Sequence, residues 1–210
     1  MTDILELKKI KDARVVDDNF PFFTVSNAFI DKLIIKSLVE DFPLVSAGGS
    51  FLSKDLNAGP SFLKLVKELE GKKLRRILEK KFKIDLSDKP VVTTFRGYSR
   101  KKDGKIHSDS KTKIITVLLY LNEKWTHKNG RLRLLPGDKN IDEYLIEIPA
   151  TLGSLVAFKV EKNCWHGYKS FVGNRLALQL NYLYEESLVK HNLRHKLSSE
   201  TKKLLGLLFK

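Results

Sequence analysis

The chain has 210 residues, 42% of them hydrophobic and 30% charged, which is enough for one sizeable core and too few to require two full domains. It carries 39 Lys and Arg against 25 Asp and Glu, and this formal net charge of +14 raises the question of an acidic partner. No apolar run reaches the roughly 18 residues of a membrane span, the N-terminus has acids where a secretory signal would be apolar, and the single cysteine, Cys164, excludes an intramolecular disulfide and a cysteine-based zinc site. We therefore expect a single cytoplasmic domain, residues 1–210.

Residues 1–89 are expected to supply N-terminal strands and supporting helices. Residues 13–25 combine β-branched and aromatic side chains with a turn-like stretch, which predicts short strands near a sheet edge. Ser26 and Asn27 are suitable caps for a following helix, whose apolar stripe would end near Pro43.

The next two segments differ in their periodicity. Residues 46–60 contain three glycines, end in a proline and show no repeat, so we expect a mobile loop and a candidate lid. From residue 61 to residue 82, apolar side chains recur at steps of three to five residues, which predicts a helix interrupted at Gly71 with lysines and an arginine on its outer face.

Residues 90–185 have a different pattern, made of short extended runs separated by turn signals. The runs are VVTTFRGY, KIITVLLYLN, RLRLLP, EYLIEIP, GSLVAFKV and NRLALQLNYLYE. Strands at this spacing indicate an all-β sandwich or barrel. The tail, residues 186–210, returns to a helical pattern and predicts a C-terminal helix. The expected fold class is therefore mainly β with flanking helices.

The excess of basic residues has a simple structural explanation. It lies partly in residues 62–83 and partly in the C-terminal tail, both of helical period, so solvated lysine-rich helix faces account for it. Aromatic residues are not interleaved with these runs, and no base-flipping or groove-reading motif is present. A nucleic-acid partner is therefore disfavoured, while an acidic substrate stays open.

The strongest chemical signal is His107-Ser108-Asp109 together with the distant His166. In an extended segment, residues i and i+2 point to the same face, so His107 and Asp109 can converge on one ion while Ser108 points away. Two imidazoles and one carboxylate form the facial triad of non-heme Fe(II) oxygenases, which leaves positions open for a cosubstrate and dioxygen. Cys164, two residues before His166, is interpreted as a packing residue and not as a fourth ligand.

Arg175 strengthens this signal because it interrupts an otherwise apolar strand, GNRLALQLNYL. By alternation it shares a face with Ala177 and Gln179, and the small alanine leaves room for a ligand. A guanidinium binds a carboxylate through two parallel charge-assisted hydrogen bonds, which lysine cannot reproduce. The alternative is a structural salt bridge to an Asp or Glu.

The segments HSDS, IITVLLYLNEKW, NGRLRLLPG, TLGSLVAFKV, CWHGYKSF and GNRLALQLNYL, in this order, resemble the 2-oxoglutarate/Fe(II) oxygenases of the prolyl 4-hydroxylase type, including the hypoxia-inducible-factor prolyl hydroxylases and their bacterial relatives. The resemblance covers roughly residues 90–185. It implies a double-stranded β-helix core, also described as jelly-roll or cupin-like, with the iron near one open end.

The resemblance also assigns roles to individual residues. It places Fe(II) on His107, Asp109 and His166. It places the C-5 carboxylate of 2-oxoglutarate on Arg175, with Tyr120 and Tyr98 as further residues of the cosubstrate pocket; a core tyrosine is the alternative for Tyr120. The chain departs from the family where Asn129-Gly130 replaces two adjacent glycines and where residues 99–105 form an unusually basic loop, interpreted as a hairpin tip or as a contact for an acidic substrate.

The implied activity is a dioxygenase that couples oxidative decarboxylation of 2-oxoglutarate to hydroxylation of an unactivated C–H bond, with O₂ consumed and ascorbate as a reductant. Because Asp109 is present where related halogenases have a small residue, hydroxylation is favoured over halogenation. The first substrate suggested by the family is a prolyl or other amino-acid or peptidyl group. Two alternatives stay open: the same enzyme class acting on a small metabolite or surface-sugar component, and a cupin-like protein that binds a metal or ligand without turnover.

Overall fold

The computed structural model describes residues 3–30 and 32–185 of the chain. The helices are α1 (Leu7–Asp12), α2 (Lys32–Glu40), α3 (Pro60–Leu69) and α4 (Lys72–Phe82), with a short 3-10 helix η1 at Ser53–Asp55. The strands are β1 (Phe22–Val25), β2 (Phe51–Leu52), β3 (Val91–Ser99), β4 (Lys113–Tyr120), β5 (Leu132–Leu134), β6 (Ile146–Ile148), β7 (Leu155–Lys159), β8 (His166–Gly167) and β9 (Gly173–Leu183). The expected C-terminal helix, residues 186–210, lies outside the described residues.

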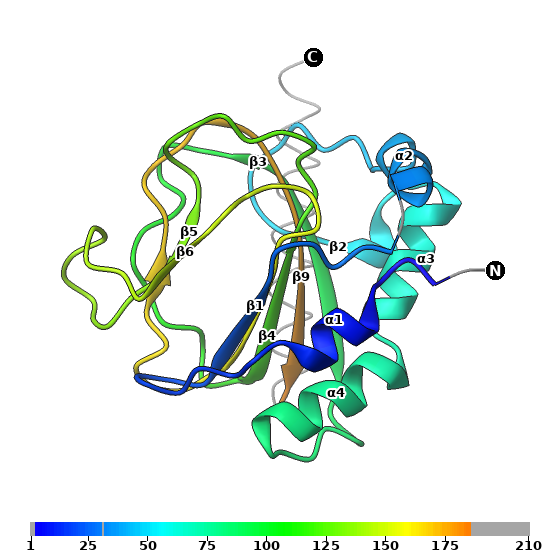
Figure 1. Ribbon diagram of the computed structural model, residues 1–210. Coiled ribbons are helices and arrows are strands. Elements are labelled where there is room, and N and C mark those ends of the chain that lie inside the picture. Colours follow the sequence, from blue (N-terminus) through cyan, green and yellow to red (C-terminus); the bar gives the residue numbers. More distant parts are fainter. Residues whose placement is uncertain (1–2, 31, 186–210) are drawn as a thin grey trace.

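Two antiparallel sheets form the core of the fold. The larger has the strand order β1-β7-β4-β9-β3-β2, and the smaller has the order β6-β5-β8. The four helices lie on one side of the larger sheet, and β5 and β6 lie on the other (Figure 1). This arrangement is a double-stranded β-helix with flanking helices, so the predicted fold class is confirmed. As predicted for residues 13–25, β1 forms an edge of the larger sheet.

Alternation along each strand divides the larger sheet into two chemically different faces. Val117, Leu119, Leu178 and Leu180 belong to an apolar cluster with buried residues of the helices, including Phe62 of α3 and Leu74 of α4. On the opposite face, a second cluster includes Tyr120 and Ala177 of the larger sheet together with Leu132 and Leu134 of the smaller one. The space between the sheets is therefore walled by side chains of both.

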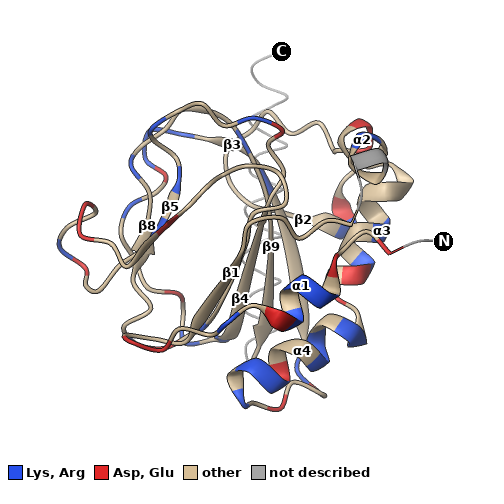
Figure 2. Cartoon of the chain, viewed as in Figure 1, with Lys and Arg blue, Asp and Glu red and all other residues tan. Residues whose placement is uncertain are grey.

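The predicted helix over residues 61–82 is confirmed as α3 and α4, which are separated at Gly71. Pro60 begins α3, a position where its missing N–H costs no helical hydrogen bond. Helix α4 has six basic residues and one acid, Glu79 (Figure 2), and Lys72, Lys73, Arg76 and Lys80 are exposed. Within the described part of the chain, no helix is long and apolar enough to span a bilayer.

Three local expectations differ from the structure. The segment 46–60 is not a loop throughout, because Phe51–Leu52 pairs with β3 and is followed by the 3-10 helix. The helix expected after Asn27 begins later, at Lys32, because the Asn27 side chain instead accepts a hydrogen bond from the Phe29 N–H (3.1 Å). The six-residue α1 was not predicted, since it is too short to show a clear periodic pattern.

Candidate metal centre

The structure brings His107, Asp109 and His166 together. One potential ligand atom from each of the three lies within 4.8 Å of the others. The two histidines come from segments far apart in sequence and are joined by an antiparallel bridge, in which the N–H of each donates to the carbonyl of the other (3.0 and 2.9 Å). Their rings are tilted against each other, with centroids 4.3 Å apart. This convergence was expected from the sequence.

Backbone carbonyls fix the tautomer of both histidines. Nδ1 of His107 lies 2.9 Å from the carbonyl oxygen of Lys105, and Nδ1 of His166 lies 2.8 Å from that of Cys164. Because a carbonyl only accepts, each Nδ1 carries a proton, so in the neutral imidazole Nε2 keeps its lone pair for a metal. Burial lowers the pKa of His166 to about 4, so this ligand is neutral at pH 7.

Asp109 is held in its ionised form by two neighbours. Lys113 Nζ donates to Oδ1 (2.7 Å) and the Thr116 hydroxyl donates to Oδ2 (2.5 Å). Burial alone would raise the pKa of Asp109, but the positive charge of Lys113, the proximity of His166 and these hydrogen bonds lower it to about 2. Each oxygen still has a lone pair for a cation. Two imidazoles and an ionised carboxylate fit a divalent transition metal with oxygen and nitrogen ligands.

The triad opens into a cavity of about 330 Å³ between the two sheets. Strands β3, β4 and β9 of the larger sheet supply one wall, and β5 and β8 contribute from the smaller sheet. The lining residues include Ser50, Thr94, Arg96, His107, Asp109, Lys113, Leu118, Tyr120, Leu132, His166, Tyr168, Arg175, Gln179 and Asn181. Ser50 is the lining residue that comes from the segment 46–60, the candidate lid. His107 is exposed, so the cavity has an opening beside the triad.

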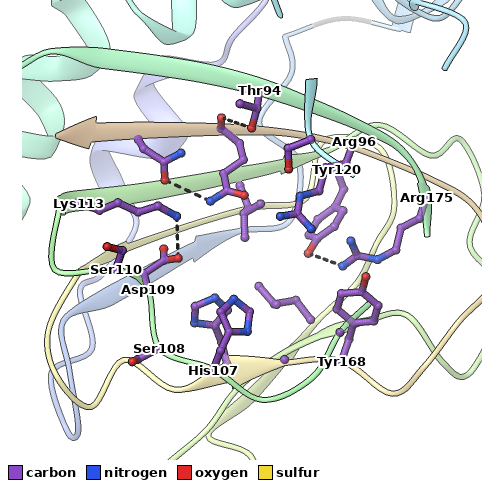
Figure 3. Close-up of a pocket in the computed structure, with 18 of the residues that line it drawn as sticks. Thr94, Arg96, His107, Ser108, Asp109, Ser110, Lys113, Tyr120, Tyr168 and Arg175 are labelled. Carbon is purple, nitrogen blue, oxygen red and sulfur yellow. Dashed lines mark hydrogen bonds and ion pairs between the residues drawn. The ribbon is translucent and has the colours of Figure 1, made fainter. Parts of the chain in front are cut away.

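Arg175 lies at the other end of this cavity, away from the triad (Figure 3). Its Nε donates to the carbonyl of Gly130 (2.7 Å) and an Nη donates to the Tyr120 hydroxyl (3.1 Å). The Tyr168 ring packs against the guanidinium, with 4.0 Å from Cζ to the ring centroid. Among the described residues, no carboxylate forms a salt bridge with Arg175. The described residues therefore do not support the alternative of a structural ion pair.

The Asn129-Gly130 departure has a structural reason. Gly130 has a φ of +82°, and a Cβ there would lie 2.5 Å from the Trp125 ring. Glycine is therefore required at this position, where the carbonyl turns toward Arg175. The preceding Asn129 is exposed and bonds the carbonyl of Ser170 through its side chain (3.1 Å), so a second glycine is not needed.

Tyr98 is not among the residues that line the cavity. A register shift between Arg96 and Tyr98 places Tyr98 opposite Asn174. Because Asn174 is adjacent to Arg175 on β9, it lies on the other face of the sheet, and Tyr98 lies on that face with it. Two residues that line the cavity near Arg175, Arg96 and Tyr168, were not predicted from the sequence. The Tyr168 hydroxyl lies 3.0 Å from Ser99 Oγ. Gly97, between Arg96 and Tyr98, is a local signal for such a bulge that the sequence interpretation did not use.

Two neighbours of the site take structural roles. Cys164 is buried in the apolar cluster between the sheets, and burial raises the pKa of its thiol, which matches the expected packing residue. In the basic loop 99–105, Arg100 pairs with Asp103 (2.9 Å) and Lys101 and Lys102 are exposed at a turn. The loop is not the tip of a hairpin, because β3 pairs with β9 and β2 and not with β4.

Comparisons with known proteins agree with this geometry. Residues 93–183 match the family model of the 2OG-Fe(II) oxygenase superfamily. No curated protein matches the chain. Among solved structures, a Pseudomonas putida prolyl-4-hydroxylase is 15% identical, with a TM-score of 0.55 over 88% of this chain and 94% of the other. A prolyl hydroxylase from Trichoplax adhaerens, in complex with a hypoxia-inducible-factor peptide fragment, is 16% identical, with a TM-score of 0.50 over 86% and 90%.

HygX from Streptomyces hygroscopicus, solved with nickel and 2-oxoglutarate bound, is 12% identical and has a TM-score of 0.53 over 80% of this chain and 85% of the other. At these identities the structural likeness establishes the fold. The match to the family model covers the segment that carries the triad and Arg175.

Proposed function

Because this chain belongs to the 2OG-Fe(II) oxygenase superfamily, we propose that His107, Asp109 and His166 bind its Fe(II) and that Arg175 binds the distal carboxylate of 2-oxoglutarate. The observation that carries the assignment is the placement of the triad and of an arginine without a carboxylate partner at two ends of one cavity. A dicarboxylic acid that chelates the metal at one end needs a cation at the other.

The protein side chains have distinct tasks in this proposal. When bound, iron with 2-oxoglutarate and dioxygen supplies the oxidising power to hydroxylate an unactivated C–H bond. Arg175 orients the cosubstrate through its guanidinium, which the Gly130 carbonyl and the Tyr120 hydroxyl hold in place. Lys113 and Thr116 fix the carboxylate of Asp109, and the backbone carbonyls fix both imidazoles. The metal ligands are thus preorganised.

A prolyl or other peptidyl group is the first substrate to test. The support is that this fold is shared with prolyl hydroxylases, one of which was solved with a peptide fragment. A small metabolite is the second class to test, because one fold accommodates many substrates and the fold alone does not select between the two classes.

Succinate formation from 2-oxoglutarate tests the proposal. The assay contains Fe(II), ascorbate and air, without and with candidate substrates, and compares the wild-type protein with His107→Ala and Arg175→Ala. His127→Ala and Arg76→Gln are matched controls, because these side chains are exposed and line no part of the cavity. Bound iron is measured for each protein alongside turnover.

We expect iron-dependent succinate formation in the wild type and both controls, and loss in both site variants. His107→Ala should also lose bound iron, whereas Arg175→Ala should keep iron and lose 2-oxoglutarate binding. Wild-type protein that binds neither iron nor 2-oxoglutarate would overturn the assignment and favour the cupin-like alternative. Binding of both without turnover would leave the site assignment intact and indicate that turnover requires the primary substrate.

A further inference from the structure

Arg96 is the charged residue of the cavity that the proposed function does not use. It extends from β3 into the cavity beside Tyr120 (Figure 3). Its Nε is buried and has no hydrogen-bond partner among the described residues. A buried donor of a charged group without an acceptor is costly, so such an atom in a ligand cavity indicates an acceptor that arrives with the ligand.

The charges around the cavity also leave room for an anion. Its described lining contains Arg96, Lys113 and Arg175 but only one acidic residue, Asp109. Asp109 is paired with Lys113, and the hydrogen bonds of Arg175 go to a carbonyl and a hydroxyl, both neutral. Burial lowers the pKa of Arg96, and the nearby positive charge of Arg175 acts in the same direction. Two guanidinium groups therefore face one cavity with no carboxylate between them.

The register of the sheet explains why the two arginines are close. Arg96 lies opposite Ala177 of β9, and Arg175 is two residues along from Ala177 on the same face. Such diagonal neighbours have Cα atoms about 7–8 Å apart, within reach of long side chains. The small side chain of Ala177 leaves the space between them free.

We propose that Arg96 binds a second carboxylate inside the cavity, in addition to the one assigned to Arg175. The proposal rests on the proposed function for the identity of the first carboxylate. The second belongs either to the metal-proximal end of 2-oxoglutarate or to a primary substrate that is itself a carboxylic acid. In both cases the guanidinium supplies paired donors that lysine cannot supply with the same geometry.

The first arm of the test measures 2-oxoglutarate binding by calorimetry on the Mn(II)-loaded protein. It compares the wild type with Arg96→Gln and Arg96→Lys, and Arg76→Gln serves as the control for the loss of one exposed arginine. If the second carboxylate is that of 2-oxoglutarate, Arg96→Gln weakens binding about 10- to 100-fold, the usual effect of losing a charge-assisted hydrogen bond. Arg96→Lys gives a smaller loss, and the control gives none.

The second arm uses acetate as a probe for the carboxylate of a primary substrate. Acetate is added to Mn(II)-loaded protein saturated with 2-oxoglutarate, and the paramagnetic broadening of its methyl signal reports acetate held near the metal. If the second carboxylate is that of the primary substrate, 2-oxoglutarate affinity is unchanged in Arg96→Gln, while the broadening is strong in the wild type and the control and is lost in the variant.

A loss in either arm supports the proposal and identifies the source of the carboxylate. Unchanged 2-oxoglutarate affinity together with unchanged acetate broadening overturns it. If wild-type protein binds no 2-oxoglutarate, the proposed function fails separately, and the acetate arm without 2-oxoglutarate then decides whether Arg96 binds a carboxylate. If Arg96→Gln does not fold, as judged by circular dichroism, the Arg96→Lys variant is carried through both arms in its place.

Discussion

The two faces of the six-stranded sheet show how one set of strands separates stability from chemistry. On β9, Leu178 and Leu180 are almost fully buried against the helix side. Their neighbours Arg175, Gln179 and Asn181 are also buried, yet they face the cavity and are polar. Alternation along the strand allows adjacent residues to have these different tasks.

The two faces also differ in the kind of polar group that each one buries without a hydrogen-bond partner. On the helix side, buried apolar surface contributes stability without directional requirements. On the cavity side, Thr116 bonds Asp109 and Gln179 bonds Asn181, but Arg96 Nε has no protein partner. Among the described residues, the helix side also has buried polar atoms without a partner, Thr93 Oγ1 and Tyr182 Oη, but these are neutral hydroxyls, whereas Arg96 is charged. The helix side therefore contributes apolar packing and the cavity side contributes charged groups, so substitutions on the two faces should have separable effects.

The largest expected effect comes from Phe95→Ala on the helix side of β3. Phe95 is fully buried and meets Phe62 of α3 edge to face, with ring centroids 5.6 Å apart. Its removal should lower the free energy of unfolding by about 3–5 kcal/mol, as is typical for a buried phenylalanine. Urea denaturation checks this. The metal affinity of the folded variant should stay at the wild-type value, and a large loss of metal binding under folding conditions would break the separation of the two faces.

The second prediction concerns the pH dependence of the metal-free protein. Burial lowers the pKa of His166 in the folded protein to about 4, from 6.5 in an unfolded chain. Between pH 6.5 and pH 4, His166 is protonated in the unfolded chain but not in the folded protein. The free energy of unfolding therefore decreases as the pH falls. The window from pH 6.5 to 4 corresponds to about 3 kcal/mol.

Chemical denaturation across this pH range, with a chelator present, measures the effect. His166→Gln should show a flatter profile than the wild type, while His127→Gln, which removes an exposed histidine, should follow the wild-type profile. Parallel profiles for the wild type and His166→Gln would show that burial on the cavity face does not hold this imidazole neutral.

The sequence was sufficient for the features that repeat along the chain or depend on short spacings. The periodic residues 61–82 predicted α3 and α4, and the alternation around Arg175 predicted which face of β9 it occupies. His107 and Asp109 are two residues apart on an extended segment, which brings them to one side. Local geometry was enough in each of these cases.

The features that the sequence did not reveal depend on contacts between distant segments. The bulge in β3 brings Arg96 and not Tyr98 to the cavity. Gly97 marks its place in the sequence, but the residues that face each other across it are known only from the pairing of β3 with β9. Tyr168 reaches Arg175 through the fold of the segment after β8. The partners of Asp109 were also missed, although Lys113 and Thr116 are close in sequence, because a short spacing alone does not show that side chains meet.

The third prediction tests one of those partners. Lys113→Met removes the ammonium group bonded to Asp109 (2.7 Å) and keeps most of the side-chain volume. Metal affinity should fall about 10- to 100-fold, the usual effect of losing a group that orients a metal ligand. Calorimetric titration with Mn(II) measures it, and Lys111→Met is the control, since Lys111 is exposed two residues away. Equal affinities in the two variants would show that Thr116 alone is enough to hold the carboxylate.

The smallest expected effect has the opposite sign. Arg96→Met replaces a partly buried guanidinium, which has an unpaired Nε, with an apolar side chain of similar length. In the ligand-free wild type, the guanidinium is partly removed from water without gaining a partner for Nε, and this costs stability. The variant avoids that cost, so its free energy of unfolding should rise by about 1 kcal/mol. Urea denaturation without metal or 2-oxoglutarate measures this, with Arg76→Met on the exposed face of α4 as the control. A destabilised Arg96→Met protein would mean that the guanidinium supports the fold itself, and the contrast between a stabilising face and a ligand-binding face would then fail at β3.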